Sequence, residues 1–367
     1  MVKMKSLQER IREYVVRHKL LDMDASDVPT LVMLSGGGDS VALLHLFTSG
    51  NDEITECVQP STITVLHINH QLRGEESDAD EVFSRELCKQ LGLPIVVRRI
   101  DAAGYAADNK LNLEDACRIL RYKEAEKLLD ELCKQQEVPS SSGHIVAAHT
   151  RDDRVENFFA RAIYGSGLGA LAGISPQRGR IIRPLLDIDR KELRDWLTAG
   201  KHQWREDPSN DDLSRTRAFI RARIVPEAEK LRPNFRENLA RTMDLIADDD
   251  TLLSSMALDF ARGFCLEREA GERIVLDARL LLTLDPVMAR RTIRTAITET
   301  FDDASRLDAS HVKAIMKGLD TLRQLLEVDT GSHAKLRPAK VIFARDVPPA
   351  LRVRLNYDTI EVARIRP

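Results

Sequence analysis

The sequence is poor in cysteine, has no long apolar run and shows no overall excess of basic residues. Its five cysteines among 367 residues are scattered and form no C-x-x-C pair, which is typical of a reducing compartment with thiols in the core. No apolar stretch approaches the roughly 20 residues that span a bilayer. The charged first 21 residues contain no apolar signal-peptide core. We therefore expect a cytoplasmic protein that begins with a helix.

The net charge of −3 argues mildly against a nucleic-acid partner, but the basic residues are concentrated locally. Residues 215–236 contain seven Lys or Arg and two acids, and residues 331–367 contain eight Lys or Arg and three acids. A solvated helix face is the ordinary explanation for a single arginine, whereas a cluster can follow a phosphate backbone. We predict nucleic-acid contact by the first cluster, through Arg215, Arg217, Arg221 and Arg223.

Short β-branched runs alternate with helical stretches through the first half of the chain. Strands are expected at 30–34, 62–69, 94–100 and 144–149, and helices at 40–47, 75–92, 112–136 and 151–165. This alternation predicts an α/β fold, with a parallel sheet that carries helices on both faces. Ligands of such sheets bind beyond the carboxyl ends of the strands, so residues that follow these strands are candidates for the site.

The pattern changes in the second half of the chain. Residues 216–327 carry helical periodicity almost throughout, and the last stretch alternates like short strands. A chain of this length is expected to form two or three domains. We predict an α/β catalytic domain over residues 1–215, a helical nucleic-acid-binding domain over 216–330, and a short basic β-rich segment over 331–367.

The stretch "LVMLSGGGDS" (31–40) places three glycines between a strand and a helix. N–H groups at a helix start attract anions, and glycines let the backbone approach a phosphate closely. The loop lacks the lysine of G-x-x-x-x-G-K-[ST] and the spacing of G-x-G-x-x-G. A carboxylate beside phosphate needs a cation between them, so we expect Asp39 to hold Mg²⁺. The alternative is a plain tight turn that Asp39 or Ser40 caps.

"SGGGDS" resembles the S-G-G-x-D-S loop of the N-type ATP pyrophosphatases, also called PP-loop enzymes, which cleave ATP to AMP and pyrophosphate. Four further segments resemble those of the tRNA(Ile)-lysidine synthases, and they lie at 67–81, 112–122, 147–174 and 181–221. They correspond to the family's H-x-x-H-x-L-R, N-x-E-x-x-x-R-x-x-R-Y, A-H-x-x-D-D-Q-x-E-T, and R-P-L-L with W-x-x-D-x-S-N. The chain is identified as a member of this family over residues 31 to about 226.

The resemblance implies a ligase that forms a carbon–nitrogen bond in two steps. ATP adenylates the oxygen at carbon 2 of the wobble cytidine in the CAU-anticodon isoleucine tRNA, and pyrophosphate leaves. The amine of free lysine then attacks that carbon and displaces AMP, which changes the tRNA from methionine to isoleucine identity. The implied partners are ATP, Mg²⁺, L-lysine and tRNA(Ile), and a homodimer is compatible with the sequence.

The resemblance also assigns site residues. Catalytic roles fall to Asp39, Glu114, Arg118, Asp153 and Arg183. ATP binding falls to Ser35, Gly36, Gly37, Gly38, Asp39, Ser40 and Arg73. Lysine binding falls to His149, Asp152 and Asp153. The basic cluster described above, and not the resemblance, assigns tRNA binding to its four arginines. Arg154 and Asn157 stand where the family usually has Gln and Thr, so no role is carried over to them.

Two of these carboxylates are candidates for the general base. An ε-amine has a pKa of about 10.4, so making it neutral at pH 7 costs roughly 4–5 kcal/mol. A nearby carboxylate or a desolvated pocket must assist, and Glu114 and Asp153 are the candidates. Glu114, Arg118 and Arg121 share one helix face at i, i+4 and i+7, where a solvated ion-pair stripe is the alternative explanation.

Two other functions remain open from the sequence. A tRNA thiolase with the same loop would need a catalytic cysteine or a cluster-binding C-x-x-C, and only Cys117 adjoins a motif. A non-catalytic protein that senses ATP and binds RNA would not need the acidic residues Asp39, Glu114 and Asp153. Failure to release pyrophosphate with any tRNA would favour this second alternative.

Overall fold

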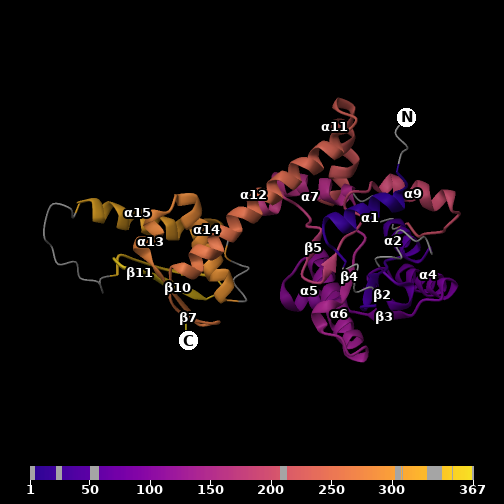
Figure 1. Ribbon diagram of the computed structural model, residues 1–367, viewed down its shortest axis with the longest axis horizontal. Helices are drawn as coiled ribbons and strands as arrows, with labels where there is room; N and C mark the ends of the chain where they lie inside the picture. Colours follow the sequence, from indigo (N-terminus) through magenta and orange to yellow (C-terminus); the bar gives the residue numbers. More distant parts are fainter. Residues whose placement is uncertain are drawn as a thin grey trace. The chain divides into compact units, whose positions relative to one another are not determined.

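The computed structural model describes residues 5–21, 27–49, 58–206, 213–301, 307, 309–328, 341–348 and 350–365. The chain forms two compact units, residues 1–246 and 247–367 (Figure 1). The boundary falls within helix α12 (Phe235–Gly263). The three-part division at residues 215 and 330 stays a prediction.

A six-stranded sheet in the order β3-β2-β1-β4-β6-β5 forms the centre of the first unit. All its neighbouring strands run parallel except the β5–β6 pair. The strands are β1 (Thr30–Met33), β2 (Ile63–Asn69), β3 (Ile95–Arg99), β4 (His144–Val146), β5 (Gln177–Arg178) and β6 (Ile181–Ile182). The predicted α/β class and all four predicted strands are confirmed.

Helices cover both faces of this sheet. Helices α1 (Leu7–Arg17), α2 (Gly38–Thr48), α4 (Glu75–Leu91) and α9 (Arg190–Ala199) share the core on one face, and α6 (Leu113–Gln135) shares the core on the other. The first unit also contains α5 (Ala102–Asn109), α7 (Arg151–Tyr164), α8 (Leu168–Leu171), α10 (Thr216–Phe219) and α11 (Val225–Leu231). Pro60–Thr62 and Ser140–Ser142 each form a short 3-10 turn, and Ile220–Ile224 forms a π-helical turn. The four predicted helices are confirmed, and α5 is an additional one.

Residues of β1 show why the sheet has apolar layers on both sides. Val32 belongs to the core that contains α1, α2 and α9, whereas Leu31 belongs to the core that contains α6. Both side chains are fully buried, as expected for a central strand of a parallel sheet. Helix α2 is buried on nearly every side, which holds its N-terminus firmly at the carboxyl end of β1.

The second unit contains a five-stranded antiparallel sheet in the order β7-β8-β11-β10-β9. Its strands are β7 (Cys265–Glu269), β8 (Arg273–Asp277), β9 (Phe343–Val347), β10 (Leu351–Leu355) and β11 (Thr359–Arg364). Helices α13 (Ala278–Thr283), α14 (Pro286–Thr300) and α15 (Ala309–Val328) pack with it into one core. Within the described residues, no helix has both the length and the apolar character to cross a membrane.

The hairpin of β7 and β8 differs from the helical periodicity predicted for residues 216–327. Gly271 adopts a φ of +76° in its turn, and Ile274, Val275 and Leu276 are buried in β8. Consecutive β-branched and apolar residues favour a strand once a sheet covers them. The strands expected in the basic C-terminal segment 331–367 are confirmed, and its residues 331–340, 349, 366 and 367 lie outside the described residues.

Candidate active site

The glycine loop between β1 and α2 presents backbone N–H groups at the start of a helix. Gly37 is the N-cap of α2, and in the described part of the chain no side chain caps this helix. The N–H groups of the first turn have no acceptor within the helix, which suits an anion. Gly36 has a φ of +87°, which residues with side chains rarely adopt. The hydroxyls of Ser35 and Ser40 lie 3.1 Å apart and join the two ends of the loop.

A segment that is distant in sequence supports the loop backbone. The N–H of Arg205 donates to the carbonyl of Gly36 at 2.9 Å, next to a short parallel bridge to the loop. Trp204 lies against Gly38, where an added Cβ would be 3.3 Å from the indole Cδ1. The W-x-x-D element therefore contacts the glycine loop, and residues 207–212 of that element lie outside the described residues.

Three carboxylates converge on the guanidinium of Arg190, which lies in the first turn of α9. Arg190 Nε donates to Asp39 Oδ2 at 2.9 Å, Nη2 to Asp153 Oδ1 at 2.9 Å, and Nη1 to Glu156 Oε1 at 3.2 Å. Only 15% of the Arg190 side chain and 3% of the Glu156 side chain are exposed. These four residues, termed the carboxylate cluster, link the glycine loop to the start of α7.

Asp153 is held in an ionised state by its neighbours. Its Oδ2 accepts from the Thr150 N–H at 2.7 Å and from the Thr150 hydroxyl at 3.0 Å, which forms the capping box of α7. Burial raises the pKa of Asp153, but Arg190, His149 and the bonds from Thr150 outweigh burial and hold that pKa below its usual value. A carboxylate with a lowered pKa binds an ammonium well and is a weak general base.

The neighbouring Asp152 has partners on two other helices. Its Oδ2 accepts from the backbone N–H of Arg190 at 2.7 Å, and its Oδ1 accepts from the guanidinium of Arg236. Asp152 therefore anchors α9 and the beginning of α12 to α7. Its assignment to lysine binding stays a prediction.

Arg221, one of the four arginines predicted to bind tRNA, forms a bidentate ion pair with Glu156. Its Nε lies 2.7 Å from Oε1 and its Nη2 lies 3.1 Å from Oε2. Arg221 is part of the π-helical turn Ile220–Ile224, a geometry that is frequent at functional sites. In contrast, Arg215, Arg217 and Arg223 are exposed.

His149 follows β4 and is surrounded by charged groups. Burial lowers the pKa of His149 to about 4, and the guanidiniums of Arg183 and Arg121 lower it as well. The carboxylate of Asp153 acts in the opposite direction and raises this pKa. The imidazole is therefore neutral at pH 7. Its Nδ1 and the Nε of Arg183 are buried and make no hydrogen bond within the described residues. The side chain of Arg183 is itself buried.

Other predicted residues lie outside the carboxylate cluster. Glu114 is exposed in the first turn of α6 and pairs with Arg217 at 3.2 Å. Arg118, one turn further along, pairs with Asp115 at 3.2 Å and is also exposed. Neither residue has a contact with the cluster among the interactions found in the described part of the chain. Their catalytic assignments stay predictions.

Arg73 and His70 follow β2. Arg73 donates to Asp80 at 2.7 Å, and Asp80 also binds Arg205, the residue that supports the glycine loop. Burial lowers the pKa of His70 to about 4, and Arg121 acts in the same direction. Two ion pairs thus connect Arg73, predicted to bind ATP, with the segment beside the loop.

The donor set at Asp39 fits a hard cation that is shared with phosphate. One oxygen, Oδ2, binds Arg190, whereas Oδ1 is buried and has no hydrogen-bond partner in the described part of the chain. Mg²⁺ is commonly held by one or two carboxylates together with phosphate oxygens. No group of three or more His, Cys, Asp or Glu among the described residues could hold a metal ion alone. A metal at Asp39 would therefore depend on the phosphates of a nucleotide.

Sequence reasoning did not identify Arg190 and Glu156 as site residues. Arg190 lies inside the segment that resembles R-P-L-L, and Glu156 follows Asp153 by three positions, which places both on one face of α7. Glu156 also stands at the glutamate of the A-H-x-x-D-D-Q-x-E-T motif, and that match was the available signal. The convergence of Arg190 on residues 39 and 153 depends on tertiary packing and leaves no pattern in the sequence.

Three of the cysteines in the described residues are buried, and burial raises the pKa of each thiol. Cys88, Cys117 and Cys133 are buried, and burial raises the pKa of Cys88 to about 11. Catalytic thiols have a lowered pKa, so these resemble ordinary core residues. Cys265 lies in the second unit and Cys57 lies outside the described residues.

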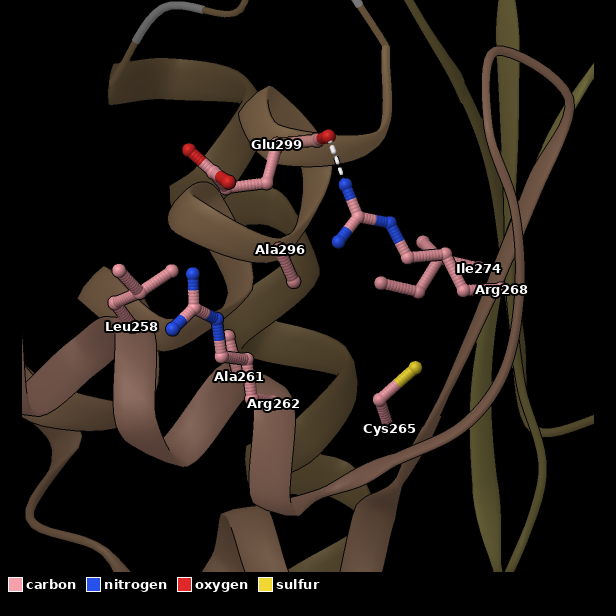
Figure 2. Close-up of a pocket in the computed structure, with 8 residues that line it drawn as sticks. All are labelled: Leu258, Ala261, Arg262, Cys265, Arg268, Ile274, Ala296 and Glu299. Atoms are coloured by element: carbon pink, nitrogen blue, oxygen red, sulfur yellow. Dashed lines mark hydrogen bonds between the residues drawn. The ribbon is translucent and has the colours of Figure 1, made fainter.

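A pocket of about 190 Å³ in the second unit holds none of the predicted site residues. Figure 2 shows Arg262, Cys265, Arg268 and Glu299 around it, with the guanidinium of Arg268 bonded to the backbone carbonyl of Glu299. Its lining is mainly apolar, and it contains no carboxylate cluster comparable to that of the first unit. The chemistry that the sequence predicted is concentrated in the first unit.

Comparison with known proteins gives consistent matches. Residues 6–228 match the family model of the PP-loop domain. A tRNA(Ile)-lysidine synthase of Parabacteroides distasonis is 34% identical over 74% of this chain and 55% of that protein. The tRNA(Ile)-lysidine synthase of Chlorobaculum tepidum is 36% identical over 62% of this chain and 64% of that protein. The one of Symbiobacterium thermophilum is 31% identical over 98% of this chain and 70% of that protein. The chain thus spans little more than half the length of some relatives.

Proposed function

Because the chain belongs to the tRNA(Ile)-lysidine synthase family of PP-loop proteins, we propose that it joins free L-lysine to carbon 2 of the wobble cytidine in the CAU-anticodon isoleucine tRNA. ATP is consumed, and AMP and pyrophosphate are released. The observation that carries the proposal is the carboxylate cluster, in which Arg190 joins Asp39 of the nucleotide loop to Asp153 and Glu156. We also propose a cytoplasmic location, and sedimentation would test the predicted homodimer.

The glycine loop is proposed to bind the phosphates of ATP. N–H groups of the first turn of α2 face the anion, and Ser35 and Ser40 hold the loop closed. Oδ1 of Asp39 would hold Mg²⁺, and the ion would neutralise charge on the departing pyrophosphate. Arg73 and Arg183 are proposed to act near the same phosphates.

The carboxylate cluster is proposed to bind the lysine substrate. Its member Asp153 is held ionised, so this carboxylate can attract the ammonium of the substrate. Asp153 and neutral His149 are the proposed contacts, with Asp152 supporting them. The lowered pKa of Asp153 leaves Glu114 as the favoured proton acceptor, with Arg118 beside it.

The tRNA is proposed to follow exposed arginines on the segment after the site. Arg215, Arg217 and Arg223 are exposed, and Arg217 pairs with Glu114 and so lies next to α6. Arginines of this kind bind phosphates without reading sequence. We therefore expect this segment to position the anticodon loop over the glycine loop.

The test is incorporation of labelled lysine into a CAU-anticodon tRNA in the presence of ATP and Mg²⁺. Asp39→Ala should lower incorporation by a factor of about 100 or more, because it removes the metal ligand and the partner of Arg190. Asp195→Ala is the matched control, since Asp195 is exposed on α9 and pairs only with Lys191 among the interactions found in the described residues.

A wild-type protein that is folded, binds ATP and incorporates no lysine would reject lysidine synthesis. Release of pyrophosphate with sulfur incorporation would then favour the thiolase. Absence of pyrophosphate release with any tRNA would favour the non-catalytic alternative.

A further inference from the structure

We propose that Arg190 is a positioning residue that couples the glycine loop to the lysine site, an inference that rests on the proposed function. Each of its three guanidinium nitrogens bonds a different carboxylate: Nε bonds Asp39, Nη2 bonds Asp153 and Nη1 bonds Glu156. Asp39 belongs to α2, whereas the other two belong to α7. One rigid planar group therefore sets the distance between the two halves of the site.

Arg190 is fixed at its backbone as well as at its guanidinium. Its N–H donates to Asp152 Oδ2 at 2.7 Å. The preceding residue, Asp189, is the N-cap of α9 and forms a capping box with Glu192. A side chain that is held at both ends transmits a displacement of α2 to α7 with little loss.

The contact leaves the other oxygen of Asp39 available for chemistry. Arg190 binds Oδ2, and Oδ1 has no hydrogen-bond partner in the described part of the chain. Arg190 can therefore orient Asp39 without occupying the oxygen proposed for Mg²⁺. This separation distinguishes a positioning role from a direct contact with the nucleotide.

A lysine at position 190 would keep the charge and lose the geometry. Arginine presents donors in a fixed plane, whereas an ammonium is a compact point charge on a flexible stem. It could not bind three acceptors in the arrangement seen here. Arg190→Lys thus separates the charge of the residue from its positioning effect.

Arg151 provides a matched control on the neighbouring helix. Only 6% of its side chain is exposed, and it forms ion pairs with Asp189 at 3.0 Å and with Asp187 at 3.2 Å. It contacts no member of the carboxylate cluster among the interactions found in the described residues. Its partner Asp189 is the N-cap of α9, so this control also includes the effect of disturbing the start of α9 without removing a guanidinium from the cluster. Arg151→Lys therefore reports the cost of changing a buried structural arginine.

The first assay measures the rate of lysine incorporation well below the melting temperature of each variant, with the ATP and lysine concentrations varied separately. Calorimetry then measures lysine binding by the same variants. We expect Arg190→Lys to lower kcat about 100-fold and to weaken lysine binding about tenfold. Arg151→Lys should keep both values close to those of the wild type. Equal kcat and lysine affinity in the two variants would overturn the inference.

A second measurement covers the case in which Arg190→Lys does not fold. Lysine binding is then measured without nucleotide in the wild type and in Asp39→Asn. Coupling through Arg190 predicts that Asp39→Asn changes lysine affinity about fivefold or more. An unchanged affinity would refute the coupling. A folded wild type that neither binds nor incorporates lysine would instead reject the proposed function.

Discussion

Gly36 is the position of the glycine loop whose backbone conformation disfavours a side chain. Its φ of +87° is rarely adopted by other residues, although a Cβ there would make only an ordinary 3.6 Å contact with Phe83. The expected cost of Gly36→Ala is therefore a backbone cost, about 1–2 kcal/mol in the free energy of unfolding. Chemical denaturation measures this value directly.

Gly37 is the control within the same loop. Its φ of −73° is accessible to alanine, and a Cβ would lie 3.5 Å from the Ser35 hydroxyl. Gly37→Ala should cost about 0.5 kcal/mol, mainly because alanine is a poor N-cap. Equal destabilisation by both substitutions would show that backbone conformation is not the cause.

Some site residues could be predicted from sequence patterns, and others could not. Asp39 could be predicted because a carboxylate after a glycine loop has a clear chemical meaning. Arg190 could not be predicted, because α9 lies 151 positions further along the chain and only tertiary packing brings its first turn to Asp39. Asp152 and Asp153 share the assignment to lysine binding, and Asp153 alone is also assigned to catalysis; their different partners separate a helix anchor from a member of the carboxylate cluster.

Helix α4 is fastened to the sheet by the buried carboxylate of Glu81. It accepts from Arg99 of β3 at 2.9 Å, from Asn69 of β2 at 3.2 Å and from Arg85 at 2.9 Å. Burial alone would raise the pKa of Glu81, but these bonds outweigh burial and lower that pKa to about 2. The ionised form is therefore favoured by the folded state.

The pH dependence of stability follows from this shift. A pKa that is lower in the folded state gives stability that is fully present above about pH 4.5 and is lost as the pH falls toward 2. Glu81→Gln should cost about 1.5–3 kcal/mol at pH 7 and flatten this acid dependence. Glu86→Gln, on the exposed face of the same helix, should do neither. Thermal melts from pH 7 to pH 3 make the comparison, and parallel curves for Glu81→Gln and the wild type would contradict it.

Elements of the first unit could be predicted because their patterns agree with their environment. Strands β1, β2 and β4 are short β-branched runs with buried side chains in a parallel sheet, and β3 is a half-buried strand at its edge, so composition and burial indicate the same structure. The β7–β8 hairpin was missed because helical periodicity and strand burial both fit a short apolar run. Only the glycine at position 271, which forms the turn of the hairpin, favours two strands over a helix.

Across the full chain, attraction to a polyanion must come from local segments, because the net charge is −3. Arg217→Ala and Arg223→Ala should each weaken tRNA binding and reduce the slope of log affinity against log salt by about 1.

Arg221→Ala should instead destabilise the fold, because buried Glu156 would lose one of its two guanidiniums. Filter binding over a range of salt concentrations, with melting curves for all three variants, tests this contrast. An undiminished slope in both exposed variants would exclude this segment from the tRNA path.

Trp204 and Gly38 pack directly against each other, so each limits the size of the side chain at the other position. A side chain at position 38 would press on the indole ring at 3.3 Å, and a smaller residue at position 204 would leave a gap beside the loop. A substitution at either position therefore changes the packing at the other. The glycine loop and the segment that follows α9 are mechanically one unit at this contact, although the chain separates them by most of the first unit.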